Sequence, residues 1–116
     1  MTIKLVILFG SHAAGEAGKR SDTDIAVLAD HPLDLDDRGG IAEKMAKRLS
    51  VTEDDIDIVD LWSASPLLQH EVAEKGKLLE GDDYDFLRFR VLAWKRYQDT
   101  AKFRRVRERA LARKHE

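Results

Sequence analysis

The distribution of apolar and polar residues along the chain first predicts its strands. Residues 3–9 are apolar at almost every position and rich in branched side chains, which is typical of a strand buried on both faces. A second apolar run at 23–29 predicts a second strand, and partial alternation of apolar and acidic residues at 55–61 predicts a third. Between the first two, residues 10–21 are small and polar with three glycines, so we expect a loop there.

A helix is expected between the second and third strands. Ile41, Met45 and Leu49 follow one another at four-residue spacing, which places them on one face of a helix. Asp37 is of the residue type that caps a helix, and it precedes this apolar stripe. We therefore predict a helix that begins after Asp37.

A second helix is indicated by its start and stop residues. Ser65 can cap a helix, and Pro66 suits the first helical position because its missing N–H would have no helical partner there. The helix is expected to reach about Lys75 and to end at Gly76. Residues 77–80 are interpreted as a short extra strand or as a link.

Residues 83–116 contain neither proline nor glycine, and their apolar residues keep helical spacing. We expect one long helix or two helices with a bend. Leu87, Val91 and Trp94 add a second apolar face, which is more than a small core needs. The residues of the first face are Phe86, Phe89, Ala93 and Tyr97, continued by Phe103, Val106 and Ala110.

The length of 116 residues predicts a single domain, with an α/β core at 1–82 and a helical segment at 83–116. The chain has no cysteine, which excludes disulfides, thiolate zinc sites and thiol nucleophiles. The apolar run at 5–9 is too short for a membrane span or a signal-peptide core. We therefore expect a cytoplasmic protein with no membrane association.

Charge is divided unevenly along the chain. Residues 1–82 carry nine Lys and Arg against 17 Asp and Glu, a net charge of −8, whereas residues 83–116 carry 11 against five, a net charge of +6. A basic segment on an acidic body suggests contact with an anionic molecule or an acidic partner surface, and a merely solvated helix is the alternative. Few aromatic residues lie among the arginines of the basic segment 83–116, so we do not expect direct nucleic-acid binding.

Three aspartates carry the candidate chemistry. On a strand, Asp22 and Asp24 project from the same face, and two carboxylates this close repel each other unless a cation lies between them. Asp57 sits between two isoleucines of the third strand, where a carboxylate is costly without a partner. If the third strand adjoins the second at matching height, the three carboxylates can hold Mg²⁺, with two ions about 4 Å apart.

Gly10 and Ser11 end the first strand and are the candidates for contacting a phosphate. Glycine allows a phosphate to approach the backbone, and the following amides and the Ser11 hydroxyl can donate hydrogen bonds to it. Asp60 is the rival of Asp57 for the third ligand, but it lies three residues away and so on the opposite face of a regular strand. We prefer Asp57, and we interpret His12 as a bystander in the loop.

These motifs together resemble the signature of the polymerase-β-type nucleotidyltransferase superfamily, and the small size resembles its minimal nucleotidyltransferase (MNT) branch. The motifs are Leu-Phe-Gly-Ser-His-Ala-Ala-Gly at 8–15, Ser-Asp-Thr-Asp-Ile-Ala-Val at 21–27 and Ile-Asp-Ile-Val-Asp-Leu at 56–61. The likeness covers essentially the whole chain. It implies a small α/β (α+β) fold with a mixed sheet, helices packed mainly on one side and a long C-terminal helix.

The resemblance also implies a function, because MNT proteins are usually the antitoxins of HEPN–MNT toxin–antitoxin pairs. By that likeness, Asp22, Asp24 and Asp57 are the catalytic metal ligands, and Gly10 and Ser11 contact the triphosphate. The implied reaction is Mg²⁺-dependent transfer of AMP from ATP to a tyrosine of the partner HEPN ribonuclease, which silences it. The helical segment 83–116 is then the expected partner-binding part.

The sequence departs from the family pattern at two positions, where His12 and Ala14 stand in place of the usual arginines. Arginine reads phosphate through paired hydrogen bonds, and Lys19 or Arg20 can replace that only in part. One alternative is therefore an antitoxin that acts by direct binding with an idle nucleotide site. Another is transfer to a small-molecule hydroxyl, although this chain has no room for an acceptor-binding domain.

Overall fold

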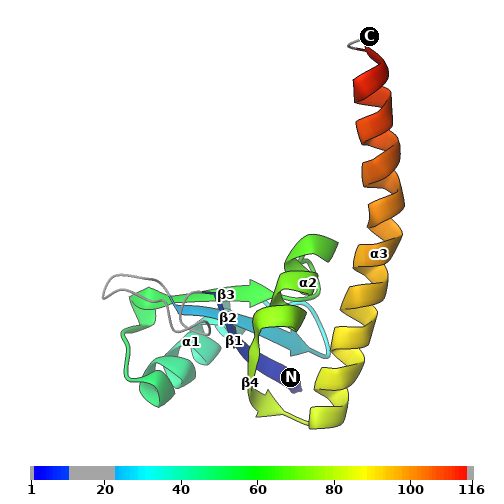
Figure 1. Ribbon diagram of the computed structural model, residues 1–116. Helices are drawn as coiled ribbons and strands as arrows, with labels where there is room; N and C mark the ends of the chain where they lie inside the picture. Colours follow the sequence, from blue (N-terminus) through cyan, green and yellow to red (C-terminus); the bar gives the residue numbers. More distant parts are fainter. Residues whose placement is uncertain (1, 11–22, 115–116) are drawn as a thin grey trace.

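The computed structural model describes residues 2–10 and 23–114, which form a four-stranded sheet and three helices (Figure 1). The sheet order is β3-β2-β1-β4, with β2 and β3 parallel and β1 antiparallel to both of its neighbours. The predicted mixed α/β fold is confirmed. The strands are β1 (Ile3–Phe9), β2 (Thr23–Ala29), β3 (Ile56–Asp60) and β4 (Lys77–Gly81), and the helices are α1 (Leu35–Leu49), α2 (Pro66–Lys75) and α3 (Asp83–Lys114).

Both faces of the sheet are covered, because side chains alternate along each central strand and both alternating sets are apolar. α1 packs on one face, and α2 and α3 pack on the other (Figure 1). We expected the helices mainly on one side; two of the three do share a face, and α1 lies opposite them. The core on the α1 face includes Val6, Ile25, Val27, Ile41 and Met45, and the core on the other face includes Leu5, Ile7, Ala26, Val72, Phe89 and Ala93.

The prediction that Asp37 caps α1 was wrong, because the helix begins one turn earlier with Asp34 as its N-cap. The Asp34 carboxylate accepts a hydrogen bond from the Asp37 amide at 2.8 Å, and the Asp37 carboxylate accepts one from the Asp34 amide at 3.1 Å. This reciprocal pair is a capping box, in which the second acid belongs to the first helical turn. Two acids three residues apart therefore share the start of the helix.

The predicted start and stop of α2 are confirmed. The Ser65 hydroxyl accepts a hydrogen bond from the Leu68 amide at 3.2 Å, and Pro66 occupies the first helical turn. Gly76 ends the helix, and a β-carbon at this position would overlap the side chain of Ile7. The missing side chain thus lets the chain turn directly into β4, which pairs with β1.

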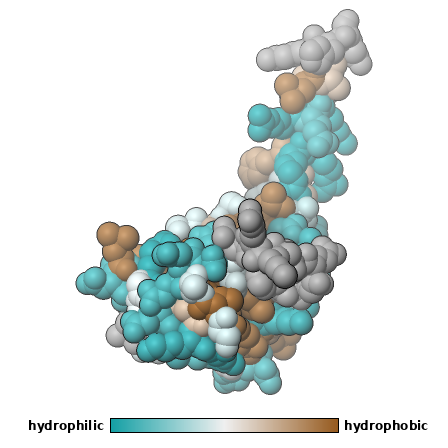
Figure 2. Space-filling model, turned by 90° about the vertical axis from the view of Figure 1, so that its left-hand side faces the viewer, coloured by the Kyte–Doolittle hydropathy of each residue, from teal (hydrophilic) through white to brown (hydrophobic). Residues whose placement is uncertain are grey.

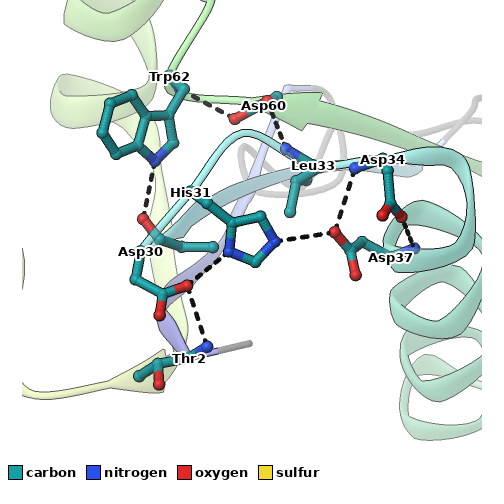
Figure 3. Close-up of polar contacts among 9 residues, drawn as sticks. Thr2, Asp30, His31, Leu33, Asp34, Asp37, Asp60 and Trp62 are labelled. Carbon is teal, nitrogen blue, oxygen red and sulfur yellow. Dashed lines mark hydrogen bonds and ion pairs between the residues drawn. The ribbon is translucent and has the colours of Figure 1, made fainter.

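Asp60 and Trp62 tie together the loops that follow β2 and β3 (Figure 3). The Asp60 side chain is 6% exposed, and its two oxygens accept hydrogen bonds from the Leu33 and Trp62 amides, both at 3.0 Å. The Trp62 indole donates to the Ala29 carbonyl at 2.8 Å. Trp62 therefore anchors the end of β2 to the loop after β3.

His31 lies between two carboxylates in the loop that joins β2 to α1 (Figure 3). Its Nδ1 is 2.7 Å from Asp30 Oδ1, and its Nε2 is 3.1 Å from Asp37 Oδ2. The hydrogen bonds to Asp30 and then to Asp37 raise the pKa of His31 above its ordinary value of 6.5. The same contact with His31 lowers the pKa of Asp30, and the Asp34 amide does most to lower that of Asp37.

α3 is a single unbroken helix that projects well beyond the body of the molecule (Figure 1). Phe89 and Ala93 anchor its first half in the core, and the ring of Tyr97 stacks on His70 of α2 with centroids 4.1 Å apart. From residue 102 to residue 112 every side chain is exposed. No helix within residues 2–10 and 23–114 is both long and apolar enough to cross a membrane.

The His31 contacts predict a pH-dependent contribution to stability. A raised folded-state pKa stabilises the protein below the unfolded value of 6.5, and that contribution is lost as the pH rises through the folded-state value. His31→Gln should therefore lower the free energy of unfolding more at about pH 5.5 than at about pH 8.5. Urea unfolding of both proteins at the two pH values measures this, and an equal loss at both would contradict it.

Candidate active site

Asp24 and Asp57 lie side by side on neighbouring parallel strands. The pairing of β2 with β3 sets Asp24 opposite Asp57, and the pairs on either side are Thr23 with Ile56 and Ile25 with Ile58. Neighbouring strands are about 4.8 Å apart, and paired residues project from the same face. The condition set by the sequence analysis, a third strand adjoining the second at matching height, is therefore met for this pair.

The two carboxylates share a face with the core formed by α2 and α3, but they lie at the opposite end of the strands. Residues 26 and 28 of β2 and residue 59 of β3 belong to that core. Because side chains alternate along a strand, Asp24 projects from the same face as residues 26 and 28, and Asp57 from the same face as residue 59. Asp24 is half-buried and Asp57 is exposed. The pair is thus held by a rigid sheet while Asp57 remains open to an incoming substrate.

Gly10, at the end of β1, lies next to Asp24. Phe9 pairs with Asp24, and the next residue, Gly10, has a φ of 78°, which favours glycine. A β-carbon on Gly10 would overlap Oδ2 of Asp24. The missing side chain of Gly10 therefore makes room for the Asp24 carboxylate.

Asp22 and Ser11, the other two residues predicted for this site, lie outside the described residues, as do His12 and Ala14. Within the part that the structure describes, no three acidic or histidine side chains come together as a metal site. The donor set that is placed consists of two carboxylates, Asp24 and Asp57. Oxygen ligands of this kind fit Mg²⁺, and with Asp22 they would hold it.

Asp60 does not join this site. Its carboxylate lies on the α1 side of β3, is buried, and already accepts two backbone hydrogen bonds. Asp57 and Asp60 thus have different surroundings, as the period of two along a strand predicts.

A separate cavity of about 270 Å³ lies at the other end of the strands, where α3 leaves the sheet. No local sequence pattern indicates this cavity, because its lining comes from β1, the ends of β2 and β3, and both α2 and α3. Leu28, which lines the cavity, lies four positions after Asp24 on β2, so the two places are about 13 Å apart along the strand.

A comparison with protein-family models matches residues 1–85 to the family described as polymerase beta nucleotidyltransferase. This match spans β1 to the start of α3 and includes both strands that carry the carboxylates. The chain belongs to this nucleotidyltransferase family. The resemblance stated from the sequence motifs is thereby confirmed.

Two curated relatives of this nucleotidyltransferase are named protein adenylyltransferase MntA. The protein from Shewanella oneidensis is 42% identical over 96 residues, which cover 83% of this chain and 67% of the relative. The protein from Aphanizomenon flos-aquae is 38% identical, with 78% of this chain and 67% of the relative covered. The likeness thus extends to relatives whose names specify AMP transfer to a protein.

Solved structures of toxin–antitoxin complexes share the fold. A chain of a toxin–antitoxin crystal structure with AMP-PNP superposes with a TM-score of 0.77 at 37% identity, covering 96% of this chain and 88% of that one. A second match, a complex of the tri-AMPylated Shewanella oneidensis HEPN toxin with its MNT antitoxin, has a TM-score of 0.69 at 35% identity over 95% of this chain and 84% of that one. The similarity therefore includes most of α3.

The different surroundings of Asp57 and Asp60 predict unequal effects of their removal on stability. Asp60→Ala leaves two backbone amides without an acceptor and should lower the free energy of unfolding by about 3 kcal/mol. Asp57→Ala removes an exposed side chain and should change it by less than about 0.5 kcal/mol. Urea unfolding of both variants tests this, and a larger loss from Asp57→Ala would contradict it.

Proposed function

We propose that this nucleotidyltransferase is the antitoxin of a toxin–antitoxin pair and transfers AMP from ATP to a tyrosine hydroxyl of a HEPN ribonuclease toxin. The observation that carries the proposal is the alignment of Asp24 with Asp57 beside Gly10. Relatives named as protein adenylyltransferases, and solved complexes with AMP-PNP or with an AMPylated toxin, support the same reaction. We place this activity in the cytoplasm, where the ATP supply lies.

In the proposed reaction, two Mg²⁺ ions would be held by Asp22, Asp24 and Asp57. These ions would offset the charge of the triphosphate. Asp57 is the exposed carboxylate of the pair and accepts the proton of the tyrosine hydroxyl. The hydroxyl oxygen forms a bond to the α-phosphorus of ATP, the bond from that phosphorus to the bridging oxygen breaks, and pyrophosphate leaves. The sheet contributes by fixing both carboxylates before substrate arrives.

In this proposal the triphosphate of ATP binds at the end of β1. Gly10 and Ser11 contact it, and at Gly10 no side chain stands between the backbone and the site. The segment 83–116 is assigned to partner binding, because α3 extends beyond the body and the segment carries a net charge of +6 against −8 for residues 1–82.

A second candidate function is neutralisation of the toxin by contact alone. The observation that favours it is the presence of His12 and Ala14 where the family usually has arginines, which weakens the hold on phosphate. Transfer to a small-molecule hydroxyl is less well supported, because no curated or solved match described above is named for such an acceptor.

The intact mass of the co-expressed HEPN toxin after incubation with ATP and Mg²⁺ tests the proposed transfer. Wild type should add one or more AMP units, and Asp24→Asn/Asp57→Asn should reduce the rate about 100-fold or more. Removing Mg²⁺ with EDTA should stop the reaction in the same way. Asp54→Asn is the matched control, because this acid is also exposed and lies just before β3.

If the toxin stays unmodified after incubation with wild type, and if wild type and the double variant both bind it tightly, the proposed AMP transfer is contradicted. Neutralisation by contact would then be the function. A small molecule that gains AMP while the toxin does not would instead support the small-molecule acceptor.

A further inference from the structure

The cavity at the foot of α3 combines an apolar floor with a surplus of positive charge. Its volume is about 270 Å³, enough for one or two side chains of a bound protein. The apolar lining consists of Leu28, Leu61, Phe89 and Leu92. Lys4, Arg88 and Arg96 contribute three positive charges to the lining, and Asp85 contributes the one negative charge.

These cations have few partners of their own. Across residues 2–10 and 23–114, neither Lys4 nor Arg88 makes an ion pair or a side-chain hydrogen bond, and Arg96 has no ion pair. The Arg96 guanidinium donates to the Gln69 amide oxygen, Oε1, at 3.1 Å. Gln69 is itself buried, and its amide nitrogen donates to the Leu61 carbonyl at 2.9 Å. A buried amide thus fixes one cation at the wall of the cavity, which suits an anionic group.

The same side of α3 continues outward as an exposed apolar stripe that Asp99 interrupts between Leu92 and Phe103. Phe103 and Val106 follow Leu92 by 11 and 14 residues, about three and four helical turns, so the three side chains project in similar directions. They are 42%, 78% and 65% exposed in the order Leu92, Phe103 and Val106. In Figure 2 the projecting helix shows apolar patches set among hydrophilic ones.

We propose that the cavity and this stripe form one docking surface, which binds an amphipathic helix of the toxin partner with an acidic side chain at one end of its apolar face. The proposal rests on the proposed function, in which the partner is a protein. The acidic side chain enters the cavity between Lys4 and Arg88, and the apolar residues cover Leu92, Phe103 and Val106. The stripe spans about 21 Å, so the partner helix needs about 14 residues.

Charge and hydrophobicity together favour this occupant. Residues 95–114 carry nine Lys and Arg against two Asp and Glu, which would attract an acidic protein surface. RNA would also be attracted by this charge, but exposed aromatic side chains for base stacking are few, with Phe103 alone on the stripe. An apolar stripe beside a charged cavity matches the groove-binding mode of amphipathic helices.

Affinity for the HEPN toxin proposed as partner, measured by biolayer interferometry without ATP, tests the surface independently of AMP transfer. Lys4→Glu/Arg88→Glu reverses two cavity charges and should weaken binding about tenfold or more. Phe103→Ser/Val106→Ser removes the outer stripe and should weaken it to a similar degree. Because these side chains are exposed, circular dichroism should show both variants folded.

Arg90→Glu/Arg105→Glu is the matched control. It makes the same change of charge, at two positions of α3 whose side chains project away from the proposed surface, so affinity should change less than about threefold. If the control variant weakens toxin binding as much as the test variants do, overall charge explains the effect and the proposal is overturned.

Three further outcomes also overturn it. The first is unchanged toxin affinity in both test variants, with wild type binding normally. The second is that the test variants lose binding to RNA while their binding to the toxin is unchanged. The third is that wild type forms a dimer of this chain and the test variants do not. Failure of wild type itself to bind the toxin would instead count against the proposed function.

Discussion

β2 and β3 run parallel in a register that sets Asp24 directly beside Asp57, and the proposed chemistry depends on this pairing. A shift of the register by one residue would turn one carboxylate to the other face of the sheet, where the α1 core lies. The apolar residues that follow in each strand oppose such a shift, because they are buried in β2 and partly buried in β3, on both faces. The same burial that stabilises the domain therefore keeps two like charges together, at a cost that a bound cation would offset.

The two ends of the sheet serve different purposes. At the end where β2 and β3 finish, Asp60 and Trp62 bind backbone groups of the adjoining loops, and α3 begins its course beyond the body. At the end where these strands begin, Asp57 is exposed and Gly10 leaves space around Asp24. The domain is thus cross-linked at one end and open at the other, which suits a site that must admit both a nucleotide and a protein hydroxyl.

Much of this arrangement could be predicted from the sequence, because local patterns determine it. The β-branched runs predict the strands, Ser65 and Pro66 predict the start of α2, and the period of two separates Asp57 from Asp60. The start of α1 was misjudged because Asp34 and Asp37 are both capping residues, and only the reciprocal hydrogen bonds decide between them. The cavity at the foot of α3 has no sequence signal, since Lys4 and Arg88 are distant in the chain and meet only through tertiary packing.

The central claim is that Asp24 and Asp57 act together as ligands of one metal site, and Mn²⁺ standing in for Mg²⁺ tests it most directly. Electron paramagnetic resonance can titrate Mn²⁺ against the protein in the presence of a non-hydrolysable ATP analogue. The account predicts that Asp24→Asn/Asp57→Asn weakens Mn²⁺ binding about tenfold or more, while Asp54→Asn leaves it unchanged. Equal Mn²⁺ affinity in wild type and the double variant would contradict the account.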